Sequence, residues 1–335
     1  MSVRRSLVVV LVVLAGAVAV PAVAWADGPQ LSLPAEGIDW TAGTVTVSAQ
    51  YPVGTTMVAF WANGQWLASV AVADPTVAGT VSSGAPYRLT LATVFSAEAF
   101  DVQAALLGTA APLVLDPATF APSVPVLALA ADATVAPSFT LEASSDRAVT
   151  AATVETGPEP LVHRPTLVSG PGDRIVMSGV RVPYGPGWIR LTARNGFGSS
   201  TSAARSVFNL GPSARLPERS RYVLVDKRSM TLYDVRGQRV VRHYDIAVGT
   251  PSTPTPDGYF TIGAARPASG PWGVLRRPLY KVIGSKRKPS GFYIHGTDAP
   301  WSIGTWASHG CVRLYNWEIR NFSKTVPNGT LVLIR

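Results

Sequence analysis

Alternating hydrophobic and polar residues run through the first two thirds of the chain, in short stretches separated by turn residues. Residues 56–72 alternate on either side of Asn63-Gly64, and Asn-Gly between two alternating stretches is the strongest short-range signal for a β-hairpin. Three further stretches alternate in the same way: residues 43–51, 87–94 and 100–107. This regular spacing of short strands and turns predicts a β-sandwich over residues 28–120.

Residues 121–210 repeat the same pattern and predict a second β-sandwich. Its last part predicts a hairpin, with strands over 188–193 and 200–208 around Asn195-Gly196. In their strand spacing and Asn-Gly turns, both units resemble bacterial immunoglobulin-like domains. Neither contains a cluster of histidine and carboxylate residues at ligand spacing. We therefore expect no chemistry in the first two units.

The pattern changes after a proline-bounded linker at residues 212–217, and residues 218–335 predict a third unit that is mainly β. The expected strands occupy residues 221–249, 258–262, 291–295 and 329–335, with turns near Asp226-Lys227-Arg228 and Arg236-Gly237. The strand before the Gly296-Thr297 pair ends at His295. Residues 316–326 predict one short helix, with Trp317, Phe322 and Val326 on its apolar face. The whole chain is therefore predicted to be mainly β.

The N-terminus has the form of a secretory signal peptide. Arg4 and Arg5 precede the apolar stretch 7–20, and Ala24-Trp25-Ala26 has the small-x-small form of a cleavage site. An uncleaved membrane anchor is the alternative, but the apolar stretch is short for a full span. We expect residues 1–26 to be removed and the protein to be exported to the cell wall or a periplasm-like space.

Positive charge is concentrated in the third unit. The 335-residue chain has a net charge of +9, and residues 211–335 contain 19 Lys and Arg against 7 Asp and Glu. A basic exported unit points to an anionic partner, such as a cell-wall polymer or a phospholipid surface. We expect no nucleic-acid partner outside the cell, and we expect a monomer.

The chain contains a single cysteine, Cys311, within the sequence ASHGCVRLY. An unpaired cysteine in an exported protein indicates a reactive thiol or an intermolecular bridge, and the alternative is a small buried apolar residue. A histidine nearby favours the reactive thiol, because a base can activate it as a nucleophile. His295 and His309 are both candidates. Gly310 permits close backbone approach, and the N–H groups of Gly310 and Cys311 are candidate oxyanion donors.

Arg313 follows two residues later and can bind a carboxylate through two N–H groups. One cysteine and two histidines also suggest a transition-metal site. However, His309 and Cys311 are separated by one residue, which is a poor spacing for convergent ligands on a turn. We therefore expect neither a metal nor a cofactor.

Three motifs together carry a specific resemblance: YIHGT at 293–297, SHGCVRL at 308–314, and AVGTPSTPTPDGYFTI at 247–262. In these motifs the chain resembles the YkuD-type L,D-transpeptidase catalytic domain over about residues 220–335. The resemblance implies an enzyme that acts on peptidoglycan stem peptides. Its cysteine attacks the amide bond of a tetrapeptide donor and releases the terminal D-Ala. The amine of a second stem then resolves the thioester.

The resemblance also implies a role for each matching residue. Cys311 corresponds to the nucleophile, and His295 to the general acid and base. His309 corresponds to a second histidine that shapes the site. Ser308 corresponds to a residue that orients the histidines. Arg313 corresponds to a residue that holds a substrate carboxylate.

The same site is compatible with other acceptors. Water as the acceptor gives an L,D-carboxypeptidase, and a protein amine gives attachment of a protein to the wall. An alternative interpretation outside the enzymes is a non-catalytic scaffold that binds the cell wall. Two nearby features also have two interpretations each. Residues 265–291 are either a substrate lid or wall, or a solvated basic loop. Trp301 and Trp306 either line the donor site or pack beneath the loop, and we expect packing.

Overall fold

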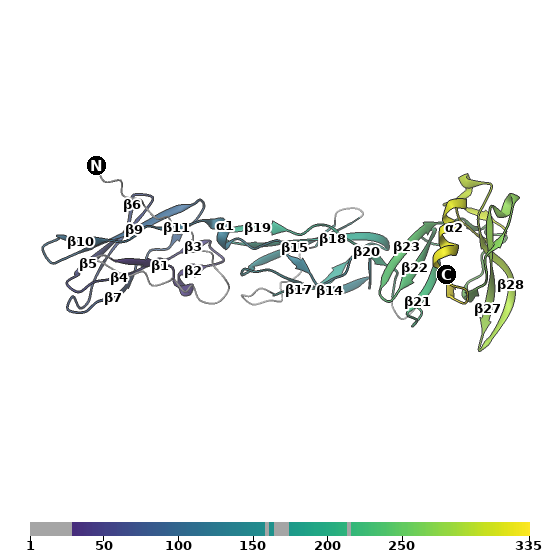
Figure 1. Cartoon of the computed structure of the whole chain (residues 1–335), viewed down its shortest axis with the longest axis horizontal. Helices are drawn as coiled ribbons and strands as arrows, with labels where there is room; N and C mark the ends of the chain where they lie inside the picture. The colour runs from purple at the N-terminus through teal and green to yellow at the C-terminus, as the bar shows by residue number, and fades with distance from the viewer. Residues whose placement is uncertain (1–28, 158–160, 164–173, 213–215) are drawn as a thin grey trace.

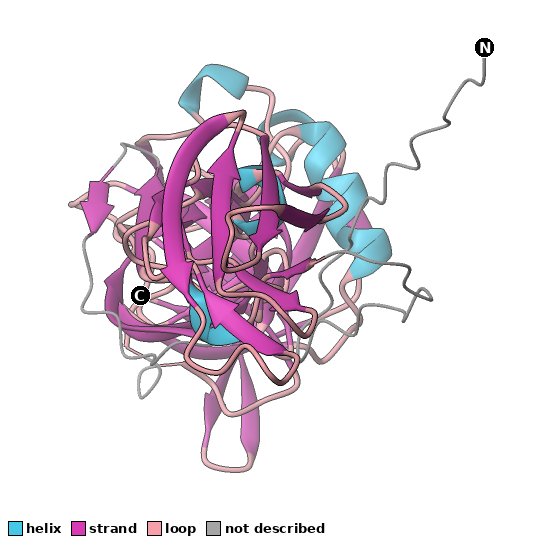
Figure 2. Cartoon of the chain, turned by 90° about the vertical axis from the view of Figure 1, so that its left-hand side faces the viewer, coloured by secondary structure: helices cyan, strands magenta, loops and turns pink. Residues whose placement is uncertain are grey.

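The computed structural model describes residues 29–157, 161–163, 174–212 and 216–335. These residues form a rod of three units that follow one another along the chain, with the N-terminus at one end (Figure 1). Strands dominate when the rod is viewed along its length (Figure 2), so the prediction of a mainly β chain is confirmed. The predicted signal peptide and part of the predicted linker lie outside the described residues. Within the described part, no helix is long and apolar enough to span a bilayer.

The first unit has two main sheets that enclose one apolar core. One sheet has the order β1 (Gln30–Ser32), β4 (Ser48–Tyr51), β7 (Gly79–Ser82). The other contains β10 (Leu106–Thr109), β9 (Thr93–Phe100), β5 (Met57–Ala62), β6 (Gln65–Ala71) and β11 (Leu113–Leu115). A small sheet joins β2 (Ile38–Asp39), β3 (Thr44–Val45) and β8 (Tyr87–Arg88). The predicted Asn63-Gly64 hairpin is confirmed, because both residues have positive φ between β5 and β6.

The second unit also places two sheets around a core of its own. A three-stranded sheet has the order β12 (Val126–Leu127), β14 (Ser138–Ser144), β17 (Arg174–Arg181). The opposite sheet contains β16 (Leu161–His163), β15 (Ala151–Gly157), β18 (Gly185–Asn195), β19 (Gly198–Thr201), β20 (Arg205–Asn209) and β13 (Ala133–Val135). The predicted hairpin is confirmed in part. β18 pairs with β19, with Asn195 opposite Gly198, but the second strand predicted over 200–208 is divided into β19 and β20, which both pair with β18. The immunoglobulin-like class of both units stays a prediction.

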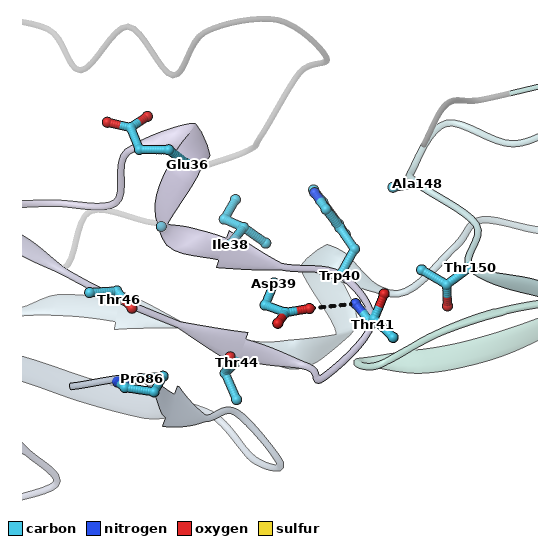
Figure 3. Close-up of a pocket in the computed structure, with 11 residues that line it drawn as sticks. Glu36, Ile38, Asp39, Trp40, Thr41, Thr44, Thr46, Pro86, Ala148 and Thr150 are labelled. Carbon is cyan, nitrogen blue, oxygen red and sulfur yellow. Dashed lines mark hydrogen bonds between the residues drawn. The ribbon is translucent and has the colours of Figure 1, made fainter. Parts of the chain in front are cut away.

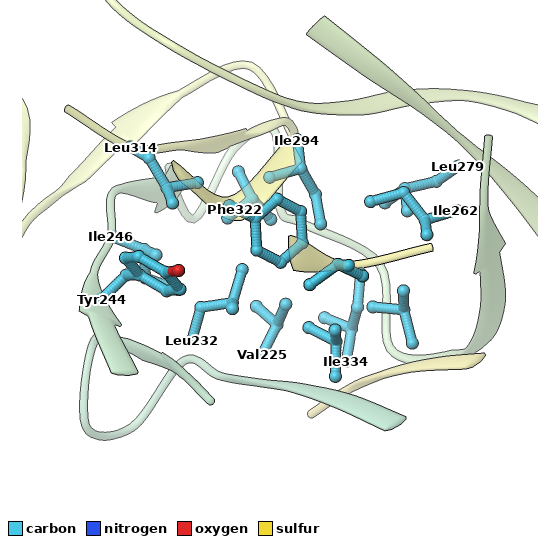
Figure 4. Close-up of a cluster of buried hydrophobic side chains, with 14 of the residues drawn as sticks. Val225, Leu232, Tyr244, Ile246, Ile262, Leu279, Ile294, Leu314, Phe322 and Ile334 are labelled. Carbon is cyan, nitrogen blue, oxygen red and sulfur yellow. The ribbon is translucent and has the colours of Figure 1, made fainter. Parts of the chain in front are cut away.

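The third unit is built on a strongly twisted sheet whose central strands are buried. Its order is β23 (Arg239–Asp245), β22 (Thr231–Arg236), β21 (Arg221–Asp226), β31 (Leu331–Ile334), β25 (Gly258–Ile262), β27 (Leu275–Ile283), β28 (Lys286–His295), β30 (Val312–Arg313). β26 (Arg266–Pro267) pairs with β27, and β24 (Val248–Gly249) forms a separate pair with β29 (Trp306–Ser308). Side chains from these strands and from α2 (Asn316–Thr325) meet in one apolar core (Figure 4).

The predicted helix is present as α2, but its predicted apolar face is wrong in part. Phe322 and Val326 are buried in the core, whereas Trp317 is 66% exposed. Ile319 takes the inward position instead, because residues three and four apart share a helix face and Phe322 lies three residues on. Trp317 stacks on Tyr315 at the surface, with ring centroids 6.3 Å apart.

Residues 265–291 do not form a solvated loop, which was one of the two interpretations of their sequence. They contain β26, β27 and the start of β28, and β27 and β28 form the long hairpin at the far end of the rod (Figure 1). Only Gly284 and Ser285 turn the chain between these two strands, and Gly284 has a φ of +59°. The basic side chains of this region are therefore held in a sheet, where strand register decides their neighbours.

The junction between the first and second units is built around the Asn195 hairpin. The Gly196 N–H donates to the Trp40 carbonyl at 2.6 Å, and the Trp40 ring packs edge-on against Phe197 at 5.8 Å. The Asn195 amide donates to the carbonyls of Phe120 and Ala148. α1 (Pro117–Phe120) leads into this junction and is capped by the Asp116 side chain. A cavity of about 480 Å³ opens beside it (Figure 3).

The second junction is more extensive, because the second and third units share a sheet. β13 pairs in parallel with β20 of the second unit and through Ala133 with β23 of the third. An apolar cluster crosses the same boundary: Phe208, Leu210, Tyr222, Leu224, Tyr233, Val235, Val240 and Leu333. Arg335 completes it by donating to the Tyr184 hydroxyl at 2.9 Å and to the Leu210 carbonyl, beside Asp226 at 3.4 Å.

Candidate active site

Cys311 lies on the tight turn between β29 and β30, where the small two-stranded sheet meets the edge of the large sheet. Gly310 makes this turn possible. Its φ is +105°, and a Cβ atom there would lie 2.4 Å from Cε1 of Phe292. Both the backbone angle and the space therefore require glycine directly before the cysteine.

Ser308 holds the turn closed through backbone contacts. Its hydroxyl donates to the Cys311 carbonyl at 2.6 Å and accepts from the Gly310 N–H at 3.1 Å. Its own carbonyl accepts from the Thr250 N–H at 3.0 Å and from the Thr253 hydroxyl at 3.1 Å. Ser308 therefore shapes the backbone that carries Cys311. This differs from the expected role of orienting the histidines, since no hydrogen bond joins it to a histidine in the described part of the chain.

The Gly310 contact also corrects the expected pair of oxyanion donors. The Gly310 N–H already donates to Ser308, so it is not free for a substrate oxygen. The Cys311 N–H has no hydrogen-bond acceptor among the residues that the structure describes. It is the remaining candidate of the two.

His295 ends β28, which pairs in parallel with the strand that follows Cys311. Its Nδ1 forms a hydrogen bond with the Gly296 carbonyl, and the ring also lies against the Trp272 carbonyl. Burial lowers the pKa of His295 to about 4, and the positive charges of Arg313 and Arg276 lower it further. The hydrogen bonds to the Gly296 and Trp272 carbonyls act in the opposite direction. His295 is therefore neutral at pH 7 and can accept a proton.

Burial also raises the pKa of the Cys311 thiol above its ordinary value, although a hydrogen bond from the Tyr293 backbone and the charge of Arg313 act in the opposite direction. The resting site therefore holds a neutral thiol and a neutral imidazole. No hydrogen bond joins Cys311 to His295 or His309 within the described ranges. This arrangement needs a base to take the thiol proton during the reaction, since burial outweighs the nearby positive charge.

A family model described as the L,D-transpeptidase catalytic domain, YkuD, matches residues 220–334. A Bacillus licheniformis protein named as an L,D-transpeptidase, YkuD, is 36% identical over 141 residues, which cover 41% of this chain and 78% of that protein. This chain belongs to the YkuD family of L,D-transpeptidases.

A second relative agrees with this assignment. A Bacillus subtilis protein named as the L,D-transpeptidase YqjB is 33% identical over 125 residues, which cover 34% of this chain and 70% of that protein. An L,D-transpeptidase from Mycobacterium smegmatis, known from a solved structure, is 16% identical and covers 64% of this chain and 100% of its own. Its TM-score is 0.29, so the family assignment depends on the sequence relatives alone.

In this L,D-transpeptidase family member, Asn316 fixes the backbone after His295. No sequence pattern indicated this role, because an asparagine at the start of a helix usually serves the helix itself. Here its Nδ2 donates to the Thr297 carbonyl at 2.9 Å, and its Oδ1 accepts from the Val274 N–H at 3.1 Å. A Cβ atom at Gly296 would lie 2.2 Å from that Oδ1. Asn316 thereby ties β27, α2 and the end of β28 together.

Trp272 was also not predicted, and it covers the histidine. Its ring lies 4.8 Å from the His295 ring and 5.1 Å from the Tyr293 ring, measured between centroids. Only the pairing of β27 with β28 brings this residue to the site, so no local sequence signal could have identified it.

The remaining predicted residues lie around the same turn. His309 is exposed directly before Gly310, and Arg313 is half-buried at the end of β30. The expectation that Trp301 packs beneath the loop is wrong, because its side chain is 81% exposed in a short 3-10 turn at Pro300–Ser302. Trp306 is 48% exposed. Among the described residues, no three His, Cys, Asp or Glu side chains gather in a way that could hold a metal ion.

Proposed function

We propose that this protein is an exported L,D-transpeptidase that cross-links peptidoglycan stem peptides through a thioester on Cys311. One observation carries most of the proposal. A buried, neutral His295 ends the strand that lies beside the strand following the only cysteine of the chain. Family membership supplies the class of reaction, and relatives named as L,D-transpeptidases support peptide amides as substrates.

In the acylation step, the Cys311 sulfur attacks the carbonyl carbon of the amide between the stem diamino acid and D-Ala. His295 takes the thiol proton and passes it to the departing amine. The carbon–nitrogen bond breaks, D-Ala leaves, and a carbon–sulfur bond remains. The Cys311 N–H is suited to stabilise the oxyanion of the tetrahedral intermediate.

In the second step, the amine of another stem peptide attacks the thioester. His295 takes a proton from the attacking nitrogen, and the sulfur leaves and recovers a proton. A new amide joins the two stems, and the enzyme returns to its starting state. The same intermediate reacts with water in a carboxypeptidase and with a protein amine in wall attachment.

The rod shape supports a spacer role for the first two units. They separate the third unit, which contains Cys311, from the opposite end of the rod (Figure 1). An enzyme held near a membrane by its N-terminal side would in this way reach stem peptides at a distance. Export itself is inferred from the form of residues 1–26.

The test is the intact mass of residues 27–335 after incubation with a purified disaccharide-tetrapeptide, for wild type and Cys311→Ala. We expect a covalent adduct with loss of D-Ala in the wild type and none in the variant. The released products then distinguish cross-linked dimer from hydrolysed tripeptide. Folded wild-type protein that gives neither adduct nor D-Ala would overturn the proposal and favour a non-catalytic wall-binding scaffold.

A further inference from the structure

Two arginines lie on either side of His295 in a single row across the sheet. Arg276 on β27 is directly opposite His295 on β28, and His295 is in turn directly opposite Arg313 on β30. Directly opposed residues on neighbouring strands place their side chains on the same face of the sheet. The row therefore presents two guanidinium groups with the histidine between them.

Neither guanidinium is neutralised by the protein. The Nε atoms of Arg276 and Arg313 are buried and have no hydrogen-bond partner, and no Asp or Glu within the described ranges forms an ion pair with either. The adjacent Arg277 is a contrast on the opposite face. It donates to the carbonyls of Gly263 at 2.9 Å and Val326 at 2.7 Å, and to Asn328 at 2.7 Å. Arg277 is thus a structural residue, whereas Arg276 has donors that remain unused.

Two aromatic rings fix the position of Arg276. Its guanidinium carbon lies 5.4 Å from the centroid of the Trp272 ring and 5.5 Å from that of Tyr293. Stacking on rings holds the flat faces of a guanidinium and leaves its N–H edge available for an anion. The same Trp272 ring packs on His295. Arg276 is therefore held in place beside the base, with donors that a bound anion would satisfy.

We propose that Arg276 and Arg313 bind two different carboxylates of one acyl donor, on either side of the bond that is cleaved. This inference rests on the proposed function. The C-terminal carboxylate of D-Ala lies on the leaving-group side of that bond, and Arg313 binds it. A carboxylate on the side chain of the diamino acid lies on the acyl side, and Arg276 recognises it. The enzyme then selects donors whose diamino acid has a free carboxylate over donors in which that group is an amide.

The test compares two tetrapeptide donors that differ only in this group, as carboxylate or carboxamide. We expect wild-type kcat/KM to favour the carboxylate donor by about 10- to 100-fold, the range expected for one charge-assisted hydrogen-bonded pair. Arg276→Gln should lose this preference, because kcat/KM should fall about 10- to 100-fold further on the carboxylate donor than on the carboxamide donor. Arg287→Gln, at an exposed position on the same hairpin, is the matched control and should keep it.

The outcomes separate this inference from the function on which it rests. Wild-type protein that releases D-Ala equally from both donors refutes the inference and leaves the transpeptidase intact. Wild-type protein that acts on neither donor refutes the function. An Arg276→Gln variant that loses activity equally on both donors assigns Arg276 to positioning His295 and also refutes carboxylate recognition. The wild-type comparison needs no variant, so a folding defect cannot obscure it.

Discussion

The two ends of the third unit differ in whether their buried polar groups have hydrogen-bond partners. At the junction with the second unit, Arg335 contacts Tyr184, Leu210 and Asp226, and the Asp226 carboxylate also accepts from the Arg228 N–H. At the far edge, Arg276 and Arg313 keep buried Nε atoms without a partner, and the partly buried thiol of Cys311 is uncharged. An unsatisfied buried group costs stability unless binding satisfies it. The difference therefore separates residues that hold the rod together from residues that we propose to contact the substrate.

Removing the nucleophile should give the largest effect and should act on activity alone. We expect Cys311→Ala to lower kcat/KM for D-Ala release by at least about 10³-fold, because no other residue can form the thioester. The free energy of unfolding in urea should change by less than about 1 kcal/mol, since only a small side-chain group is removed. Release of D-Ala at a wild-type rate would show that Cys311 is not the nucleophile.

Breaking the junction should give the converse result. We expect Arg335→Met to lower the free energy of unfolding by about 3 kcal/mol, because it leaves the buried Asp226 carboxylate without its cation. The kcat of the folded fraction should stay close to wild type. Arg320→Met, at an exposed position on α2, is the control. Equal stability of the two variants in urea unfolding would mean that the Arg335 contacts do not hold the junction.

Gly310→Ala tests the turn that carries the thiol. We expect the free energy of unfolding to fall by about 2 kcal/mol. The causes are the left-handed backbone angle and the contact that a Cβ would make with Phe292. Gly284→Ala is a matched control, because Gly284 also has positive φ but has no atom within 4 Å of an added Cβ. The Gly310 variant should be the less stable of the two in urea. The reverse order of stability would show that contact between the added Cβ and Phe292 does not destabilise the turn.

The smallest effect concerns the charge of the resting thiol. Since burial raises the pKa of Cys311 above its ordinary value, the thiolate fraction should still be growing at neutral pH. We expect alkylation by iodoacetamide to rise about tenfold between pH 7 and pH 8 and to continue rising above pH 9. No other cysteine contributes a background. A plateau at neutral pH would indicate a thiolate paired with a protonated His295, which its lowered pKa does not support.

Local patterns predicted much of the fold, including the Asn63-Gly64 hairpin, the strand that ends at His295 and the helix over 316–325. These features depend on residues near one another in sequence. Partners set by the pairing of distant strands were not predicted. Arg276 faces His295 only because β27 and β28 pair in one register, and the sequence of that region did not predict the pairing of these two strands.

The site shows the same division. Cys311, His295 and Arg313 were selected from their types and spacing. The structure places His295 and Arg313 on the paired strands β28 and β30, and Cys311 on the turn that leads into β30. The backbone role of Ser308 and the clamp made by Asn316 depend on the directions of individual N–H and carbonyl groups. Sequence patterns do not specify such directions before the fold is known.

The position of β31 has a consequence for how the third unit forms. This strand, at residues 331–334, lies between β21 and β25 in the middle of the sheet. A chain that emerges from the ribosome or a translocation channel with its N-terminus first therefore cannot close this sheet until β31 has followed. Cys311 emerges before β31, at a stage when the third unit is not yet fully folded. Because the chain has no second cysteine, that delay cannot trap the thiol in a wrong bond within its own molecule.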